Sequence, residues 1–397
     1  MKKLDYKKVF LLGIGFFAIS VTWSIYNAFV PKILSNFISS TTIIGFIMTI
    51  DNYFALFLQP AVGILSDKID TKHGKRMPFI MIGMPLSVVF IILVANYKNL
   101  PMLITFIVLM NLSMSIFRSP VVALMPDITA KENRSKANSI INLMGGIGSV
   151  IAYIVGSKLW DLDEKYPFYL AAILMCFSFI LLFNSIKERR DVAHYEKDEA
   201  VNKGFVKSIK EALKNKSVMF LLLAICSWFI GFAGIETLFT LYGEKYLGIK
   251  TSAAAFSFTF ISIAFLISAI PAGILGTKFG KKKTITAGIV GIVVSFFIIA
   301  FMKNILYIRG MFLICGFFWA LININSYPFV TDMAPKGKIG TFTGLYYLTA
   351  SVAAIISPPL LGLIIDLLGY KYMFFYGAVF FLIAIILINK VKIESLE

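Results

Sequence analysis

The chain has 397 residues, of which 58% are hydrophobic and only 15% are charged. Because soluble domains contain about 25% charged residues, this composition excludes an ordinary soluble protein. A net charge of +17 would suit a nucleic-acid partner, but the basic residues lie in short loops between apolar runs and form no basic domain, so we expect no nucleic acid.

Twelve apolar stretches follow one another along the chain, each long enough to cross a bilayer, which takes about 20 residues per helix. We therefore expect an all-α membrane protein with twelve transmembrane helices. The predicted helices cover residues 9–30, 41–65, 77–95, 101–121, 137–158, 167–186, 217–242, 252–276, 284–302, 305–329, 339–365 and 370–390. The two histidines lie far apart in polar loops and the three cysteines lie in apolar stretches, so we expect no metal site, no cofactor and no disulfide framework.

The positive charges predict how these helices are oriented. With a cytoplasmic N-terminus, 29 of the 38 Lys and Arg residues fall in cytoplasmic segments and the other 9 fall outside. The positive-inside rule then places both termini in the cytoplasm. The high content of Lys, Ile, Phe and Asn suggests an AT-rich bacterial genome, so we expect a multi-pass protein of a bacterial cytoplasmic membrane.

The longest polar stretch divides the predicted helices into six and six. We expect an N-terminal bundle at residues 1–186, a cytoplasmic linker at 187–216 and a C-terminal bundle at 217–397. Residues 206–213 have helical periodicity and are expected to lie on the membrane surface as an amphipathic helix. A solvated linker without that helix is the alternative.

A loop motif occurs once in each half of the chain. The copies begin at Gly63 and Gly273, which are 210 residues apart, and this spacing predicts two related halves. We expect Asp67 to pair with a cation or a helix N-terminus, and Arg76 to anchor at anionic headgroups. A second repeated pair of loops follows the fourth and tenth helices. The candidate gating residues of all these loops are Gly63, Asp67, Lys68, Arg76, Asp127, Arg134, Gly273, Lys278 and Asp332.

These loops resemble the major facilitator superfamily, whose motif reads Gly-x-Leu-x-Asp-Arg/Lys followed by Gly-Arg/Lys-Arg/Lys. The resemblance implies the major facilitator fold, with two pseudo-symmetric six-helix bundles that rock about a midplane cavity. Thr277 stands where the first copy has Asp67, so we expect the N-terminal copy to dominate the gate.

Residues 65–80 and 119–127 are similar to sucrose/proton symporters and their bacterial relatives, a group beside the glycoside–pentoside–hexuronide:cation symporters. This similarity implies a cation-coupled sugar carrier. Two departures limit it. Ala55 and Gln59 precede Pro60 where melibiose-type carriers have sodium-binding acids, and Val122 replaces an Arg of the plant sucrose carriers. We therefore expect a proton rather than sodium as the coupling cation.

Two acids inside predicted helices are candidates for cation coupling, Asp51 and Glu236. A charged carboxylate in hydrocarbon costs roughly 2.5–3.5 kcal/mol, so Asp51 should face a protein interior or a wet cavity. Desolvation favours the protonated form of such a group, which suits a proton carrier. The alternatives are a structural pairing for Asp51 and a wet interfacial position for Glu236.

Sugar recognition needs planar hydrogen-bonding groups and an aromatic platform for the apolar ring face. The predicted helices contain eight candidate substrate-binding residues: Trp23, Tyr26, Asn27, Asn111, Asn142, Trp319, Asn323 and Tyr346. Each could instead bridge helices. We further expect Arg118 to snorkel or pair with Asp127, and Ser357-Pro358-Pro359 to break the eleventh helix locally.

Together these patterns favour a secondary active transporter, a monomer in the lipid bilayer, that takes up a sugar or glycoside with a cation. A proton-coupled exporter of drugs or metabolites is the alternative on the same fold. Residues 145–156 contain glycines but lack the proline of the exporters' helix 5 motif, which favours uptake. We expect no enzyme and no ATP-driven pump, because the sequence has no nucleophile–base set and no Walker loop.

Overall fold

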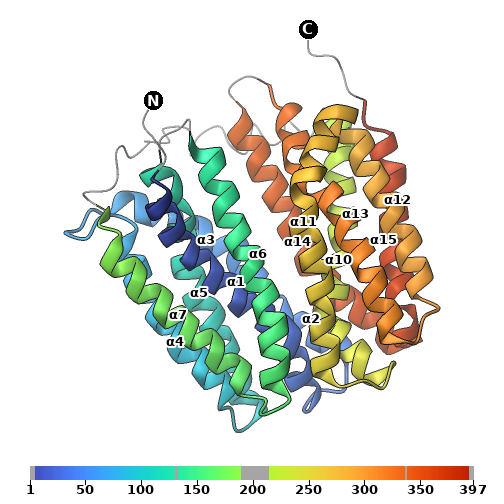
Figure 1. Cartoon of the computed structure of the whole chain (residues 1–397), viewed down its shortest axis with the longest axis horizontal. Coiled ribbons are helices and arrows are strands. Elements are labelled where there is room, and N and C mark those ends of the chain that lie inside the picture. The colour runs from blue at the N-terminus through green and yellow to red at the C-terminus, as the bar shows by residue number, and fades with distance from the viewer. Residues whose placement is uncertain (1–4, 130–132, 189–213, 336–337, 393–397) are drawn as a thin grey trace. The chain divides into compact units, whose positions relative to one another are not determined.

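The computed structural model describes residues 5–129, 133–188, 214–335 and 338–392. Within these ranges the chain is helical without β-strands, and twelve spans are long and apolar enough to cross a membrane, as the sequence predicted. Figure 1 shows the helices α1 (Tyr6–Ser35), α2 (Thr41–Met48), α3 (Ile50–Lys68), α4 (Met77–Ala95), α5 (Leu100–Ile128), α6 (Arg134–Trp160), α7 (Tyr166–Ser185), α10 (Lys216–Lys245), α11 (Thr251–Phe279), α12 (Lys281–Ile299), α13 (Ile305–Asp332), α14 (Ile339–Leu368) and α15 (Met373–Asn389). The amphipathic helix expected at 206–213 lies outside the described residues.

The chain forms two compact units. Two short segments, Ile38–Phe46 and Thr251–Thr259, are each assigned to a different unit from the residues that flank them in the sequence. Unit 1 comprises Met1–Phe37, Ile47–Lys197 and Thr251–Thr259. Unit 2 comprises Ile38–Phe46, Asp198–Lys250 and Phe260–Glu397. The start of α2 thus packs with unit 2, and the first turns of α11 pack with unit 1.

In unit 1, α1 packs against α6 and α7, α4 packs against α5 and α7, and α3 packs against α5 (Figure 1). Glycines let these helices approach at backbone distance. A Cβ on Gly148 of α6 would lie 2.6 Å from the carbonyl oxygen of Phe17 on α1. Since lipid provides no hydrophobic force between helices, such close packing is a main source of their association.

In unit 2, α10 packs against α14 and α15, and α12 packs against α13 and α15. The interior contains a cluster of rings in which Phe374 contacts Phe239, Tyr242 and Phe296 at centroid distances of 6.2, 5.3 and 5.5 Å. A Cβ on Gly288 of α12 would lie 2.8 Å from the carbonyl oxygen of Phe318 on α13. Both units are therefore tightly packed bodies.

The expected break in the eleventh span does not occur, because α14 runs without interruption through Pro358 and Pro359. Next to the prolines, the Ser357 Oγ accepts a hydrogen bond from the Gly234 N–H at 2.7 Å and donates to the Ile230 carbonyl, both on α10. The Ser357 hydroxyl thus joins α14 to α10 beside the two prolines.

The second span, Thr41–Lys68, instead has an irregularity of one residue. One continuous helix was expected over residues 41–65, but α2 ends at Met48 and α3 begins at Ile50. Thr49 lies in a turn between them, with φ −90° and ψ 0°. The break follows closely on the point where the chain passes from unit 2 to unit 1.

Candidate functional site

Two loops of unit 1 meet at a buried arginine. The Arg76 side chain is 10% exposed, and its Nε donates to Oδ2 of Asp127 at 3.1 Å. The same guanidinium pairs with Asp67 and donates to Ser66. Burial alone would lower the pKa of Arg76, but Asp127 and Asp67 together raise it above its ordinary value. Arg76 therefore joins the two loops as a permanent cation and does not anchor at headgroups as expected.

We call Asp67, Arg76 and Asp127 the clasp of unit 1. Of the other candidate gating residues here, Gly63 packs against Ser119, whose Oγ would lie 3.1 Å from an added Cβ. Arg134 donates to the carbonyl of Pro126 at 3.0 Å and so caps the end of α5. Lys68 is exposed in the last turn of α3.

Unit 2 repeats the arrangement with different side chains. Lys281 donates to Asp332 and contacts the carbonyl of Pro328 at 3.4 Å, so Lys281 and Asp332 form the clasp of unit 2. Gly280 (φ +88°) corresponds to Gly74 (φ +110°), and both positions favour glycine. Lys278 is not the cation of this clasp; its Nζ lies 5.4 Å from the Phe279 ring. Gly273 lies against Ile324, 3.8 Å from an added Cβ.

Sequence reasoning missed Glu188, the residue that holds the start of α4. Glu188 is 1% exposed, and its carboxylate accepts hydrogen bonds from the backbone N–H groups of Lys75, Arg76 and Met77 at 2.7–3.0 Å. A carboxylate at a helix N-terminus pairs the N–H groups that the helix cannot and interacts favourably with its dipole. The available signal was an acid two residues beyond the predicted end of the sixth span.

Replacing Glu188 with Ala is expected to lower the free energy of unfolding by about 2 kcal/mol, because it leaves buried N–H groups unpaired. The measurement is thermal unfolding of the purified protein in detergent. Asn184→Ala, at an exposed position of α7, is the matched control and should unfold like the unchanged protein. Equal stability of the two variants would contradict this role for Glu188.

Inside the membrane span of unit 1, several predicted residues come together. The Asn111 Nδ2 lies 3.4 Å from the Tyr26 hydroxyl, and the Trp23 ring packs edge-on to Tyr26 at 5.5 Å. Asp51 interacts electrostatically with Tyr26 and is attracted by Arg118, while its Oδ1 accepts a hydrogen bond from Asn52 at 2.8 Å. We call Trp23, Tyr26, Asp51, Asn111 and Arg118 the polar cluster.

The polar cluster offers open hydrogen-bonding atoms. Asn111 is fully buried, yet its Oδ1 has no hydrogen-bond partner in the described part of the chain, and the same holds for the buried Nε1 of Trp23. Burying such groups without a partner is unfavourable, so each is an acceptor or a donor that a ligand or water can satisfy. A hydroxyl group matches this set because it both donates and accepts.

Asp51 follows the irregularity at Thr49 and lies in the first turn of α3. The N-terminal end of a helix favours a negative charge there. Arg118 was expected to snorkel or to pair with Asp127, but Asp127 is held by Arg76, and Arg118 acts on Asp51. Asp51 is therefore an acid with nearby positive charge rather than an isolated one.

The membrane interior of unit 2 presents an aromatic wall. Trp319 of α13 stacks on Phe232 of α10 at 4.1 Å and meets Phe229 edge-on at 5.7 Å. Tyr346 of α14 packs against Phe229 at 6.4 Å, and its hydroxyl lies 3.1 Å from the Ser326 Oγ. We call Phe229, Phe232, Trp319 and Tyr346 the aromatic wall. A stacked indole of this kind is a suitable platform for an apolar ring face.

Glu236 lies on the same face of α10 as Phe229 and Phe232, which precede it by seven and four positions. It is partly exposed, and no hydrogen bond or ion pair joins its carboxyl group to another residue in the described ranges. Asn27 and Asn323 are partly buried, whereas Asn142 is exposed and donates to the Asn138 carbonyl at 2.9 Å.

Comparisons with known proteins identify the family and the fold. A family model described as "Major Facilitator Superfamily" matches residues 12–358 and 258–392. The chain belongs to the Major Facilitator Superfamily. Its fold is that of the nucleoside transporter NupG, solved in a mutant form, with a TM-score of 0.78 at 13% identity over 97% of this chain and 100% of that one. The expected fold is thus confirmed, and a protein of this family and fold is not an enzyme.

The relatives in sequence carry names of different kinds. The chain is 29% identical to "Uncharacterized MFS-type transporter YdeE" of Escherichia coli (strain K12) over 48% of this chain and 45% of that protein. It is 28% identical to "Sucrose transport protein SUC3" of Arabidopsis thaliana over 28% of this chain and 23% of that protein. It is 24% identical to "Multidrug resistance protein 2" of Bacillus subtilis (strain 168) over 67% of both chains. The match thus spans less than half of the first two relatives.

Proposed function

We propose that the chain is a secondary active transporter that takes up a sugar or glycoside with a cation, a proton rather than sodium, by alternating access. The observation that carries the proposal is the polar cluster. It holds an open donor at Trp23 and an open acceptor at Asn111 next to a titratable acid, Asp51. These are the groups needed to bind sugar hydroxyls and a proton in one place. The similarity to a sucrose transport protein supports this substrate class.

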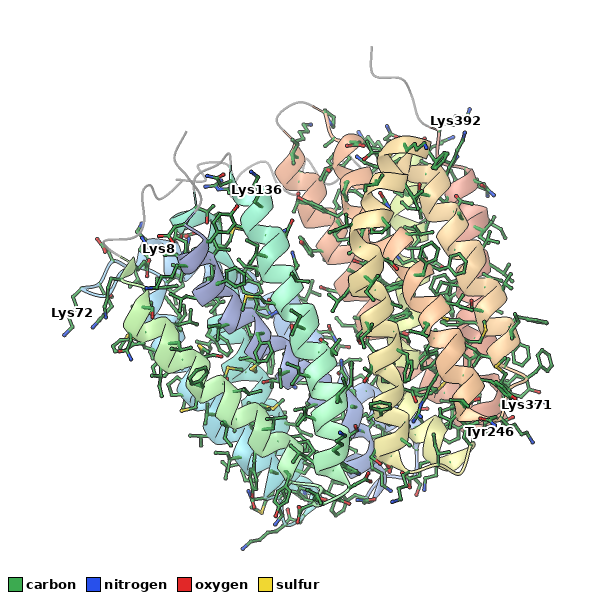
Figure 2. All side chains as sticks on the ribbon, viewed as in Figure 1. Lys8, Lys72, Lys136, Tyr246, Lys371 and Lys392 are labelled. Carbon is green, nitrogen blue, oxygen red and sulfur yellow. The ribbon has the colours of Figure 1, made fainter. Side chains whose placement is uncertain are left out.

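We propose that the protein lies in the cytoplasmic membrane of a bacterial cell, with both termini in the cytoplasm. The basic loops support it. In Figure 2, Lys8, Lys72 and Lys136 lie at one end of the unit 1 helices, and in unit 2 Lys392 lies at the end opposite Tyr246 and Lys371. We further propose that residues 1–186 and 217–397 act as the two moving halves of a monomer.

In this proposal, the aromatic wall of unit 2 is a candidate sugar-binding surface in its own right. Trp319 and Tyr346 present ring faces and a hydroxyl, with Asn323 and Glu236 as candidate hydrogen-bonding groups. Asn27 and Asn142 are candidate contacts from the N-terminal half. The clasp residues hold the loops at the cytoplasmic side.

The test is uptake by the purified protein in liposomes, with labelled mono- and disaccharides under imposed proton and sodium gradients. Accumulation of a sugar under an inward proton gradient supports the proposal. The absence of any sugar accumulation under either ion, with folded protein, contradicts it.

Asn111→Leu is expected to raise the KM for the transported sugar at least tenfold, since one lost hydrogen bond of about 1.4 kcal/mol changes affinity by that factor. Ser113→Ala is the matched control on α5, because Ser113 contacts Ser87 at 3.0 Å and is not part of the polar cluster. The measurement is the concentration dependence of uptake. An unchanged KM in Asn111→Leu would remove Asn111 from the substrate site.

A second function is favoured by one observation, the carboxyl group of Glu236 beside the aromatic wall. An acid next to stacked rings suits a cationic, aromatic substrate, and one relative is named as a multidrug resistance protein. Proton-coupled export of such compounds is therefore the alternative. Proton-driven transport of aromatic cations by the purified protein, with no sugar transport, would establish it.

A further inference from the structure

The start of α2 is bound to α14 by a single carboxylate. Asp366, near the end of α14, accepts hydrogen bonds from the backbone N–H groups of Thr41 and Thr42 at 2.7 and 2.9 Å. It also accepts from the Thr42 and Ser40 hydroxyl groups, both at 2.7 Å. Four donors thus converge on one side chain. The N–H groups belong to the first turn of a helix, where a negative charge is favoured.

Two glycines bring the same helices into backbone contact. A Cβ on Gly362 of α14 would lie 2.5 Å from the Thr41 carbonyl oxygen, and a Cβ on Gly45 of α2 would meet the Pro358 carbonyl. Pro358, Gly362 and Asp366 are spaced by four residues, so they form one stripe along α14. The segment is therefore held along its length, with Asp366 at its end.

Unit 1 contains a weaker version of this contact. Asp161, at the end of α6, accepts a hydrogen bond from the Ser252 Oγ at the start of α11, at 2.7 Å. Tyr153 of α6 packs on Phe258 of α11 at 5.4 Å. One hydroxyl group donates to Asp161, whereas four groups donate to Asp366. The stronger of the two contacts is the one on α2.

The segment that Asp366 holds ends at the break in the second span. Residues 38–46 belong to unit 2, the chain turns at Thr49, and α3 continues in unit 1. A bend at Thr49 would move α2 as a short piece and leave α3 helical. Asp51 is two residues beyond the break, in the first turn of α3.

We propose that residues 40–48 are an outer gate segment, that Asp366 latches it closed, and that Thr49 is its hinge. The inference rests on the proposed transport function for its biological meaning, and on the proposed orientation, which places the start of α2 outside. When the latch is closed, α2 stays bound to α14 of unit 2. When it opens, α2 leaves α14 and the outer side becomes accessible.

The charge is what distinguishes a latch from ordinary packing. Asp366→Asn keeps the size of the side chain but replaces one acceptor oxygen with an NH₂ group that faces N–H donors, and it removes the charge. We expect the balance of states to move toward the open form by roughly tenfold, the usual scale of conformational coupling. Asp366→Glu should restore part of the balance, because it keeps the carboxylate.

The test measures accessibility rather than transport. A cysteine is placed at Met48, which is 3% exposed when the latch is closed, in a chain whose three native cysteines are replaced. A membrane-impermeant maleimide is then added from outside to the protein in liposomes. Phe37→Cys is the control reporter, because Phe37 is already 43% exposed and its labelling rate should not depend on the latch.

The expected result is that Asp366→Asn raises the labelling rate of Met48→Cys by roughly tenfold and leaves that of Phe37→Cys unchanged. Thr42→Ala, which removes one hydroxyl donor, should give a smaller rise in the same direction. An unchanged rate at Met48→Cys in both variants overturns the latch, and so does an equal rise at both reporter positions. Faster labelling in a protein that moves no sugar would overturn the proposed substrate and leave the latch intact.

Discussion

Asp51→Asn is expected to abolish accumulation of substrate against a gradient while exchange of substrate across the bilayer continues. One coupled proton and a gradient of one pH unit supply about 1.4 kcal/mol, which concentrates a substrate about tenfold. With Asn at this position the proton has no site, so the accumulation ratio should fall to about one. The reason is the setting of Asp51, an acid inside the membrane span that interacts electrostatically with Tyr26 and Arg118.

The measurement compares gradient-driven uptake with counterflow in the same liposomes. Asn52→Ala is the matched control, since it removes the hydrogen bond to the Asp51 Oδ1 but keeps the acid. That variant should still accumulate substrate. If Asp51→Asn accumulates normally and Glu236→Gln does not, the coupling proton is carried on α10 and Asp51 is a structural partner of Arg118.

Arg76→Ala is expected to slow transport in both modes and to destabilise the protein. Removing one partner of a buried ion pair costs about 3 kcal/mol or more, because the remaining charge has no compensation. Here the change leaves Asp127, only 11% exposed, without its cation and close to Asp67 and Glu188. Arg76→Lys should be intermediate, because lysine keeps the charge and loses the fork that reaches both carboxylates.

Thermal unfolding and exchange rates together check this prediction. Lys68→Ala is the control, because Lys68 is exposed in the last turn of α3, close in sequence to the clasp. Its unfolding temperature should match that of the unchanged protein. An Arg76→Ala protein as stable as the Lys68→Ala protein would show that the clasp is not needed to hold the loops of unit 1.

The sequence predicted the twelve spans because bilayer thickness imposes a length that apolar residues must fill. It failed at the two helix irregularities. Proline is the usual signal for a break, yet α14 continues through Pro358 and Pro359, beside the hydrogen bond from Gly234 of α10 to Ser357. The second span breaks at Thr49, between a piece bound to α14 and a piece bound in unit 1. At both places the helix contacts residues that are distant in the sequence, and no local sequence pattern predicts such contacts.

The candidate site was predictable in its residue types and only partly in its partners. Tyr26, Asn111 and Asp51 were singled out because polar groups inside a membrane span need a reason to be there, and the structure brings these three together. Arg118 and Glu188 were not predicted in their observed roles. Both act on residues distant in the sequence, Asp51 and the start of α4, and such pairings depend on the fold.

The two clasps have a consequence for how such proteins recombine. Arg76 meets its carboxylates within unit 1, and Lys281 meets Asp332 within unit 2. Each half therefore carries its own charge balance at these loops. A chimera that joins residues 1–188 of this chain to the second half of a related protein would keep every ion pair of the unit 1 clasp. Exchange of halves at this junction therefore leaves the charge balance at these loops intact on both sides.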